Sequence, residues 1–419
     1  MNGDAPPTDG AASEALAALL RNPSLDRIFE AIDFGGEETR LVGGAVRNAL
    51  LGRPVHEIDL ATTAAPETTA ERASAAGIRV IPTGVEHGTL TLLVGGETFE
   101  VTSLREDVET DGRRATVRFG RDFRADALRR DFTVNALFLA KDGRIFDYVG
   151  GLDDIRARRL RFIGEPAQRI REDYLRILRF FRFSADFTEG PLDPAGLVAA
   201  MRERSGLARL SRERVRAELL KLLAARRAAE AAQEMCDAGL LGPLIASAPN
   251  PARLRRMAAI EDAGPPDPLL RLAALCVELP EDADRLGQSL RLSNAERQRL
   301  ERAARLLIPL HAREAPPGED ELRQLLFLNG RQAAADAVML AAIRAPDLAQ
   351  WVPAKHFLRE TQEPRLPFSG ADLLAHGFAR GPAIGEALDL LQTRWIAAGF
   401  PDDASVLAQM LDEVVKGSR

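Results

Sequence analysis

Two glycines, an arginine and two carboxylates stand within one short stretch of this 419-residue chain: Gly43, Gly44, Arg47, Glu57 and Asp59. Apolar residues before the glycines predict a strand, and the residues after them predict a helix. Glycine lets a phosphate group approach the backbone closely, and the free N–H groups that begin a helix attract phosphate. An arginine one turn into that helix adds a charged fork of donors. The turn is therefore a candidate triphosphate site.

Glu57 and Asp59 are two residues apart on a predicted strand, so both carboxylates face the same side. Such pairs suit Mg²⁺ that is shared with substrate phosphates. Two such ions would activate an attacking hydroxyl and stabilise a leaving pyrophosphate. Glu100, on a later predicted strand, is a candidate third catalytic carboxylate. Taken alone, the spacing also fits a surface strand with solvated acids; the nearby glycine turn favours the metal site.

A second cluster, Arg129-Arg130-Asp131, stands directly before a predicted strand with an apolar tail. Its guanidinium groups have the shape and charge to contact a phosphate or a ribose. The same residues also suit a salt-bridged start of a strand. The residues by themselves leave both interpretations open.

A third cluster contains Asp173, Arg176, Arg179 and Arg182, each three residues after the one before. On the continuous helix that we expect here, these side chains cover about half of the circumference. Asp173 and Arg176 would then present an acceptor and a donor fork to the edge of cytosine or adenine, and the later arginines would hold phosphates. The alternative is an ordinary helix, in which a first-turn acid pairs with an arginine three residues on.

The elements that must position these clusters form a mixed head and a helical remainder. Between about residues 40 and 148, strand patterns alternate with helical ones, which is typical of a sheet with helices. After Gly151 only helical periodicity remains, interrupted by stretches rich in proline and glycine. The expected strands are RLVGG, EIDLAT, IRVIP, TLTLLV, FEVTSL, FTVNALFLA and RIFDYV.

Charge is distributed unevenly along the chain. The formal net charge of −6 argues at first against a nucleic-acid partner. Residues 113–182, however, hold 18 lysines and arginines against 10 acids, so this stretch carries +8 and the remainder carries −14. The positive stretch contains the second and third clusters. We expect the cleft that they line to be positive and to attract a polyanion.

Several classes of protein are excluded. No apolar run reaches the roughly 18 residues of a membrane-spanning helix, and the first residues lack the layout of a secretory signal. Two cysteines, Cys236 and Cys276, cannot build a disulfide framework or a thiolate metal site. We therefore expect a cytoplasmic protein that has no membrane as a partner. DNA is not an expected partner either.

Five spaced motifs resemble those of the class II tRNA nucleotidyltransferases, the CCA-adding enzymes, and of the related bacterial poly(A) polymerases. The motifs span about residues 40–225 and read LVGGAVRNALLGRPVHEIDLAT, FEVTSLR, RRDFTVNALF, RIREDYLRILRFFRF and LSRERVRAELLKLL. The resemblance implies an α+β fold: a polymerase-β-like nucleotidyltransferase head with a mixed sheet, followed by an all-α neck, body and tail. The implied parts are an N-terminal extension (1–22), the head (23–150), the neck (151–225), the body (226–330) and a tRNA-binding tail (331–419).

The resemblance also implies roles for individual residues. Glu57 and Asp59 match the metal-binding carboxylates, Gly44 and Arg47 match triphosphate contacts, and Arg130 matches a nucleotide contact near the ribose. The run from Glu172 to Arg176 matches the EDxxR motif. Its acid and arginine, Asp173 and Arg176 here, serve in that family as a protein template for CTP and then ATP. Arg179 and Arg182 match further arginines of the nucleotide site.

Three positions depart from the family pattern. Glu57 stands where Asp is usual, Asn48 where Asp is common, and Tyr174 where Pro is frequent. The carboxylate of Glu57 is one methylene further from the backbone, which affects metal geometry and rate rather than the class of reaction. Residues 105–118 resemble a flexible loop that is associated with the switch from C to A addition.

The expected activity is template-independent addition of CMP, CMP and AMP, from CTP and ATP, to the 3′ end of tRNA with Mg²⁺ as cofactor. The tRNA would be recognised at its 3′ end and elbow by shape and backbone. Two alternatives stay open: a poly(A) polymerase or partial CC- or A-adding enzyme, and an inactive RNA-binding protein. The intact RRD and EDxxR motifs argue against the inactive protein.

Overall fold

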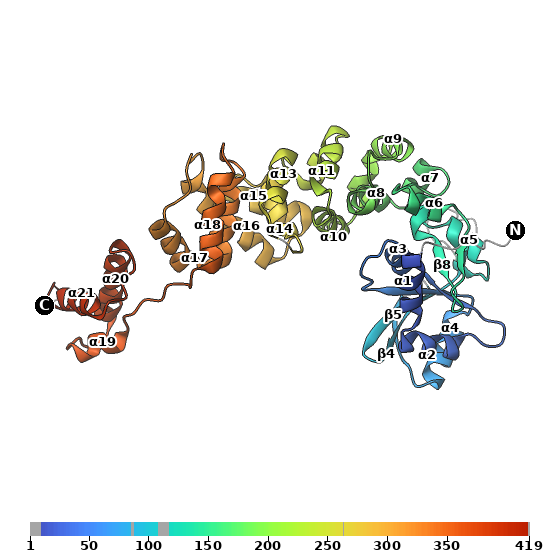
Figure 1. Cartoon of the computed structure of the whole chain (residues 1–419), viewed down its shortest axis with the longest axis horizontal. Coiled ribbons are helices and arrows are strands. Elements are labelled where there is room, and N and C mark those ends of the chain that lie inside the picture. Colours follow the sequence, from blue (N-terminus) through green and yellow to red (C-terminus); the bar gives the residue numbers. More distant parts are fainter. Residues whose placement is uncertain (1–9, 85–87, 108–116, 263, 418–419) are drawn as a thin grey trace. The chain divides into compact units, whose positions relative to one another are not determined.

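The computed structural model describes residues 10–84, 88–107, 117–262 and 264–417. By its internal contacts the chain divides into two compact units, Met1–Leu210 and Ser211–Arg419, and each is described here by itself (Figure 1). The division falls inside the neck that we expect at 151–225. The finer division into five parts stays a prediction.

A mixed sheet of seven strands forms the centre of the first unit, within the residues described. Its spatial order is β3-β4-β5-β2-β1-β8-β9. The strands are β1 (Thr39–Val42), β2 (Ile58–Thr62), β3 (Arg79–Gly84), β4 (Thr89–Val94), β5 (Glu97–Ser103), β8 (Leu137–Leu139) and β9 (Ile145–Asp147). Strands β2 and β5 run parallel, and β1 pairs antiparallel with both β2 and β8.

Two burial patterns explain why these segments are strands: alternation of buried and partly exposed residues, and continuous burial. In β4, Leu90, Leu92 and Val94 are buried, and the residues between them are partly exposed. Strand β1 lies near the middle of the sheet and is buried along its whole length. Both patterns are typical of their positions in a sheet.

Helices cover the sheet and continue beyond it. They are α1 (Gly10–Leu20), α2 (Pro23–Ile32), α3 (Gly44–Leu50), α4 (Pro66–Ala75), α5 (Phe123–Leu128), α6 (Gly151–Arg156), α7 (Pro166–Glu172), α8 (Leu175–Phe187) and α9 (Pro194–Arg202). The unit also contains short 3₁₀ helices at Thr133–Asn135, between α5 and β8, and at Arg204–Arg209, after α9. A mixed sheet with these helices confirms the expected α+β class of the head.

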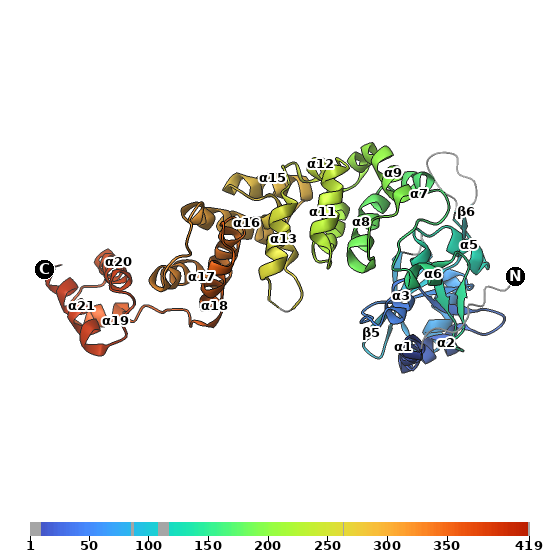
Figure 2. The ribbon, with the colours of Figure 1, turned by 45° about the horizontal axis from the view of Figure 1, so that its top comes forward.

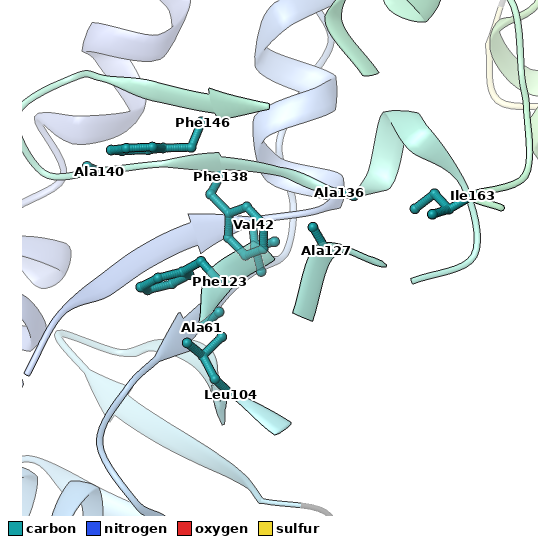
Figure 3. Packing of buried hydrophobic residues seen from close by; sticks show 10 residues of the cluster. All are labelled: Val42, Ala61, Leu104, Phe123, Ala127, Ala136, Phe138, Ala140, Phe146 and Ile163. Carbon is teal, nitrogen blue, oxygen red and sulfur yellow. The ribbon is translucent and has the colours of Figure 1, made fainter. Parts of the chain in front are cut away.

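One hydrophobic cluster holds α5 against the middle of the sheet. Phe123 of α5 contacts Phe138 of β8 edge to face, with ring centroids 5.4 Å apart. Figure 3 shows both rings beside Val42 of β1, at the end of the strand that leads into α3. This packing fixes the distance between the end of β1 and the residues after α5.

A second aromatic group joins α8 to the same part of the unit. The ring of Phe132 lies 4.8 Å from that of Phe162 and 5.7 Å from that of Phe183 on α8. Arg53, after α3, also pairs with Asp186 near the end of α8, at 2.9 Å. The packing therefore places α8 beside the Arg129–Asp131 cluster.

Each segment expected to be a strand contributes to the sheet, with one change. The segment FTVNALFLA is a strand only over Leu137–Leu139, because Thr133–Asn135 form a 3₁₀ turn. The turn arises because the carboxylate of Asp131 accepts hydrogen bonds from Phe132 N and Asn135 Nδ2. Gly151 also packs so closely on Thr133 O that a Cβ would collide with it.

The segment 105–118, expected to be a flexible loop, begins and ends with two short paired strands. These are β6 (Arg105–Asp107) and β7 (Val117–Phe119). Residues 108–116, which include Asp111, Gly112 and Arg113, lie outside the described residues.

The second unit consists of helices in the part that the structure describes (Figure 2). They are α10 (Arg212–Leu223), α11 (Ala228–Asp237), α12 (Leu241–Ile245), α13 (Pro251–Ile260), α14 (Pro268–Cys276), α15 (Pro280–Leu290), α16 (Asn294–Leu307), α17 (Glu319–Ala342), α18 (Val352–Glu360), α19 (Gly370–Ala375), α20 (Pro382–Ala397) and α21 (Ala404–Gly417). Leu391, Trp395 and Val414 form a separate core for the last three helices. Over the described residues, no helix is both long and apolar enough to span a bilayer.

Candidate active site

A tight turn at Gly43 connects β1 with α3. Gly43 has φ +73°, a conformation that other residues rarely adopt. A Cβ at this position would lie 3.7 Å from Arg130 Nη1 and 3.8 Å from Asn135 O. At Gly44, a Cβ would lie 3.9 Å from Arg47 Nη2. Two guanidinium groups therefore flank a turn that carries no side chains.

Asp59 lies next to this turn because β1 and β2 are neighbours. It is opposite Val42 in the β1–β2 register and opposite Glu100 in the β2–β5 register. Residues that are directly opposite in a ladder project from the same face of the sheet. Burial, together with the negative charges of Glu100 and Glu57, raises the pKa of Asp59 from 3.8 to about 6. Arg130 opposes that rise.

These carboxylates fit a hard cation shared with a substrate. Glu100 and Glu57 are close enough to Asp59 to raise its pKa, and a bound cation would relieve that repulsion. Among the residues that the structure describes, however, no three acids, histidines or cysteines gather closely enough to hold a metal by themselves. The set therefore fits a divalent cation that would take its remaining ligands from phosphate oxygens and water.

Arg129 and Arg130 both bind the carboxylate of Asp126 on α5. Arg129 Nε donates to Asp126 Oδ1 at 2.8 Å, and Arg130 Nε donates to Oδ2 at 3.0 Å. Burial alone would raise the pKa of Asp126, but the two arginines lower it overall. This pairing agrees with the salt-bridged alternative for the cluster. It also aims Arg130 at the glycine turn and at Asp59.

Asp131 links the second cluster to α8. Its Oδ2 accepts from Arg179 Nε at 2.7 Å, and its Oδ1 accepts from Asn135 Nδ2 at 3.1 Å. Asn135 Oδ1 in turn accepts from Arg47 Nη1. Burial alone would raise the pKa of Asp131, yet Arg179 and the hydrogen bonds lower it. Arg47 on α3 and Arg179 on α8 thus belong to one hydrogen-bond network.

The ring of Phe183 is the second link between α3 and α8. The guanidinium carbons of Arg182, Arg47 and Arg179 lie 3.9, 4.9 and 5.2 Å from its centroid. Aromatic faces attract cations, so the ring holds three positive charges in one place. Such a gathering of charge suits a polyphosphate.

The continuous helix expected for the third cluster is wrong. Helix α7 ends at Glu172, and Asp173 is extended, with φ −151° and ψ 106°. The reason is that Asp173 Oδ1 accepts from Leu175 N at 3.0 Å, which begins α8 as a new helix. Asp173 and Arg176 therefore lie on opposite sides of a helix break. They do not share a helix face.

Arg176 is nonetheless directed toward the second cluster. Its Nη1 donates to Arg169 O at 2.8 Å and pairs with Glu172, and its Nη2 lies 3.5 Å from Arg129 O. Arg176, the last residue of the EDxxR motif, stands on α8 together with Arg179 and Arg182.

The sequence did not identify two residues of this network. Asp126 accepts hydrogen bonds from two arginines, and the ring of Phe183 contacts three arginines. The spacing of Asp126 to Arg129 and Arg130, three and four residues, is that of side chains on one helix face. That signal was available, but no helix was expected at 123–128. The role of Phe183 depends on how α8 packs and has no local signal.

Comparisons with known proteins agree with this arrangement. The family model described as "Poly A polymerase head domain" matches residues 39–161, and that described as "Probable RNA and SrmB- binding site of polymerase A" matches residues 196–250. The "CCA tRNA nucleotidyltransferase 1, mitochondrial" of Danio rerio is 35% identical, and the match covers 88% of this chain and 85% of that protein.

Two bacterial proteins are similar over nearly the whole chain. A "CCA-adding enzyme" of Limosilactobacillus fermentum is 32% identical, with 94% of this chain and 96% of that protein covered. The crystal structure of the Bacillus stearothermophilus CCA-adding enzyme in complex with CTP has a TM-score of 0.69 and 27% identity, over 94% of this chain and 98% of that one.

Proposed function

Because this chain belongs to the family of CCA-adding tRNA nucleotidyltransferases, we propose that its glycine turn and carboxylates transfer CMP, CMP and AMP to the 3′ end of tRNA. The substrates would be CTP and ATP, and pyrophosphate would leave. No nucleic-acid template takes part.

The observation that carries it is the position of Asp59 beside the Gly43 turn and Arg130. In the β1–β2 register Asp59 is opposite Val42, next to the turn, and in the β2–β5 register Glu100 is opposite Asp59 on the same face. Arg130 is close to both the turn and Asp59. A nucleotidyl transfer needs these two parts in contact: acids at the reacting phosphate and cations at the leaving phosphates.

Enzymes of this family generally use a divalent metal, and we propose Mg²⁺ here, with Glu57 and Asp59 as its protein ligands. Bound there, the ion would supply activation of the tRNA 3′ hydroxyl and neutralise charge on the pyrophosphate. Glu100 would be a third carboxylate of the same face. Glu57 is exposed and precedes β2, so its longer side chain is free to adjust its reach.

The chain's own residues would bind and orient the nucleotide. Gly43 and Gly44 leave room for phosphates, and Arg47 and Arg130 place positive charge beside them. Arg130 is also the candidate ribose contact. Such positioning and charge neutralisation supply most of the rate in phosphoryl-type transfers.

Asp173 and Arg176 would read the base, with Arg179 and Arg182 supporting the nucleotide. The bond from Asp173 to Leu175 N fixes the acid at the helix break, and Arg176 is held by Glu172 and by Arg169 O. A base edge would compete with Glu172 for Arg176. Cytosine and adenine both offer an exocyclic amino donor and a ring acceptor to such a pair.

The helical second unit is proposed to hold tRNA by shape and backbone, with the body at 226–330 and the tail at 331–419. A match to an RNA-binding family model at residues 196–250 supports contact with RNA. Because the grooves of A-form RNA offer little sequence readout, recognition would rest on phosphates and shape. A cytoplasmic location stays an expectation from the sequence.

One alternative has an observation of its own. The matching head model is described as that of poly(A) polymerases, so an enzyme that adds A residues to other RNAs, or only part of CCA, is the second candidate. An inactive RNA-binding protein is the third. It is disfavoured because the network around Asp131 is complete.

The test uses three tRNA transcripts, which end before CCA, after C and after CC. Each is incubated with the protein, Mg²⁺ and labelled CTP or ATP. Ordered addition that stops after A supports the proposal. Long A tails on unrelated RNA support the second candidate, and RNA binding without any incorporation supports the third.

A further inference from the structure

Asn135 lies between two charged groups of opposite sign. Its Oδ1 accepts from Arg47 Nη1 at 2.5 Å, and its Nδ2 donates to Asp131 Oδ1 at 3.1 Å. Asn135 is 7% exposed, and Arg47 and Asp131 are 7% and 8% exposed. All three side chains are thus withdrawn from water.

The chemistry of these neighbours fixes the orientation of the amide. A guanidinium group has only donors, and an ionised carboxylate has only acceptors. The oxygen of Asn135 must therefore face Arg47, and its NH₂ group must face Asp131. The reversed amide would place donor against donor and acceptor against acceptor.

Arg47 has no carboxylate in direct contact within the described residues. Its acceptors are the amide oxygens of Asn135 and Asn48. A direct carboxylate partner would neutralise the charge that a triphosphate needs. The amide of Asn135 instead fixes the guanidinium in place and keeps its charge, because a neutral acceptor adds no negative charge.

The far side of the network is anchored on α8. Asp131 Oδ2 binds Arg179 Nε at 2.7 Å, so Asn135 and Arg179 occupy the two oxygens of one carboxylate. Within the part of the chain that the structure describes, the side chains of Asn135 and Asp131 form no hydrogen bond with the glycine turn. Their action on a nucleotide would pass through the two arginines.

We propose that Asn135 is a positioning residue, which holds the guanidinium of Arg47 beside the glycine turn without a carboxylate in direct contact and connects it through Asp131 to Arg179 on α8. The proposal rests on the function proposed above, in which Arg47 acts on the triphosphate. It extends that function by coupling the phosphate side of the nucleotide site to α8, the helix that carries the base-reading Arg176.

The test is a double-mutant cycle of Asn135→Leu and Arg47→Met, read by the KM for ATP on a tRNA that ends in CC. Leucine is close to asparagine in size and removes both hydrogen bonds. We expect each single variant to raise KM by about tenfold, as the loss of one charge-assisted hydrogen bond does. The double variant should be no worse than Arg47→Met, because Asn135 acts through Arg47.

Thr133→Val is the matched control in the same 3₁₀ turn. Thr133 Oγ1 donates to Asp154 Oδ2 at 2.6 Å, a buried hydrogen bond outside the network. The control should lower the melting temperature and leave KM within about twofold of wild type. A purely structural role for Asn135 predicts the same pattern for Asn135→Leu. An unchanged KM in Asn135→Leu, or single effects that multiply in the double variant, would overturn the proposal.

A substitute variant and a direct binding measurement allow the test to be interpreted if Asn135→Leu does not fold or if wild type shows no incorporation. Asn135→Ala replaces Asn135→Leu if the leucine does not fold, which circular dichroism decides. Binding of a fluorescent ATP analogue without tRNA gives the dissociation constant directly. A wild-type protein that binds the analogue but incorporates nothing would contradict the proposed function. The cycle would still test Asn135 through the dissociation constants.

Discussion

Arg47 in the first unit and Arg271 in the second are buried to a similar extent, at 7% and 5% exposed, but their surroundings differ. Arg271 donates to the backbone oxygens of Leu223 and Ala225 and pairs with the carboxylate of Glu261. Its charge is compensated, and its bonds tie three segments together. Arg47 has only amide oxygens as acceptors, and burial lowers its pKa to about 10.

The difference distinguishes a structural arginine from one that is kept for a ligand. A buried charge without a carboxylate partner is costly, and it persists only where something else requires it. At Arg47, the adjacent glycine turn supplies that reason. At Arg271, every bond is already made within the fold. Mutations should therefore affect activity in one region and stability in the other.

The largest effect is expected at Asp59. Asp59→Asn keeps the size of the side chain but removes a carboxylate from the group formed with Glu100 and Glu57. Incorporation of labelled AMP should fall by about 10³-fold or more, while tRNA binding in a gel-shift assay stays within a few-fold. Glu71→Gln, an exposed acid on α4, is the control and should be unchanged. Retained synthesis in Asp59→Asn would refute the assignment of this carboxylate.

In the second unit, Arg271→Met should lower the free energy of unfolding by about 3–5 kcal/mol, because the half-buried Glu261 loses its partner and the backbone oxygens of Leu223 and Ala225 lose their donor. Urea titration measures the loss. Below the unfolding transition, incorporation per folded molecule should match wild type. Arg305→Met, which removes an exposed arginine that pairs with Glu301, should change stability by less than about 1 kcal/mol. Equal losses in the two variants would contradict the structural role of Arg271.

Substitution of Gly206, in the first unit, should have an intermediate effect on stability and on KM. The ring of Tyr174 packs directly on its backbone, so a Cβ there would collide with the ring. Gly206→Ala should push Tyr174 away and shift the helix break that holds Asp173, at a cost of about 1–3 kcal/mol. The KM values for CTP and ATP should rise severalfold. Gly385→Ala, whose Cβ meets open space in α20, should leave stability and KM unchanged.

The smallest effect is a dependence of stability on pH in metal-free protein. The pKa of Asp59 is raised to about 6, so the folded state binds a proton more readily than the unfolded chain. The resulting stabilisation is full below about pH 4 and is lost as the pH rises through 6. As the pH rises from about 4 to 6, the melting temperature of wild type should decrease relative to that of Asp59→Asn. A constant difference between the two proteins would show that the pKa of Asp59 is not raised.

Local patterns were sufficient for the glycine turn and most strands. Gly43 and Gly44 stand where an apolar run changes to helical spacing, and the structure places a turn there with Gly43 at φ +73°. The alternating residues of Thr89–Val94 likewise predict a half-buried strand, as found. In both places the neighbouring residues alone decide the conformation.

Other features depend on contacts between distant residues. The pairing of Asp59 with Glu100 follows from the register of β2 and β5, which the sequence does not state. The bond between Asp131 and Arg179 joins residues that are 48 positions apart. The break at Asp173 had a local signal that was overlooked: aspartate side chains often accept a hydrogen bond from a backbone N–H two residues on, and Asp173 accepts one from Leu175 N at the start of α8.

The most direct measurement compares Arg47→Met with Arg271→Met in one experiment, using urea titration and the dissociation constant of an ATP analogue. We expect Arg47→Met to weaken nucleotide binding by about tenfold and to lose no more than about 1 kcal/mol of stability. Arg271→Met should show the reverse pattern, with binding by the folded protein unchanged. If Arg47→Met unfolds as readily as Arg271→Met while its folded fraction binds ATP normally, both arginines are structural, and Arg47 has no part in the nucleotide site.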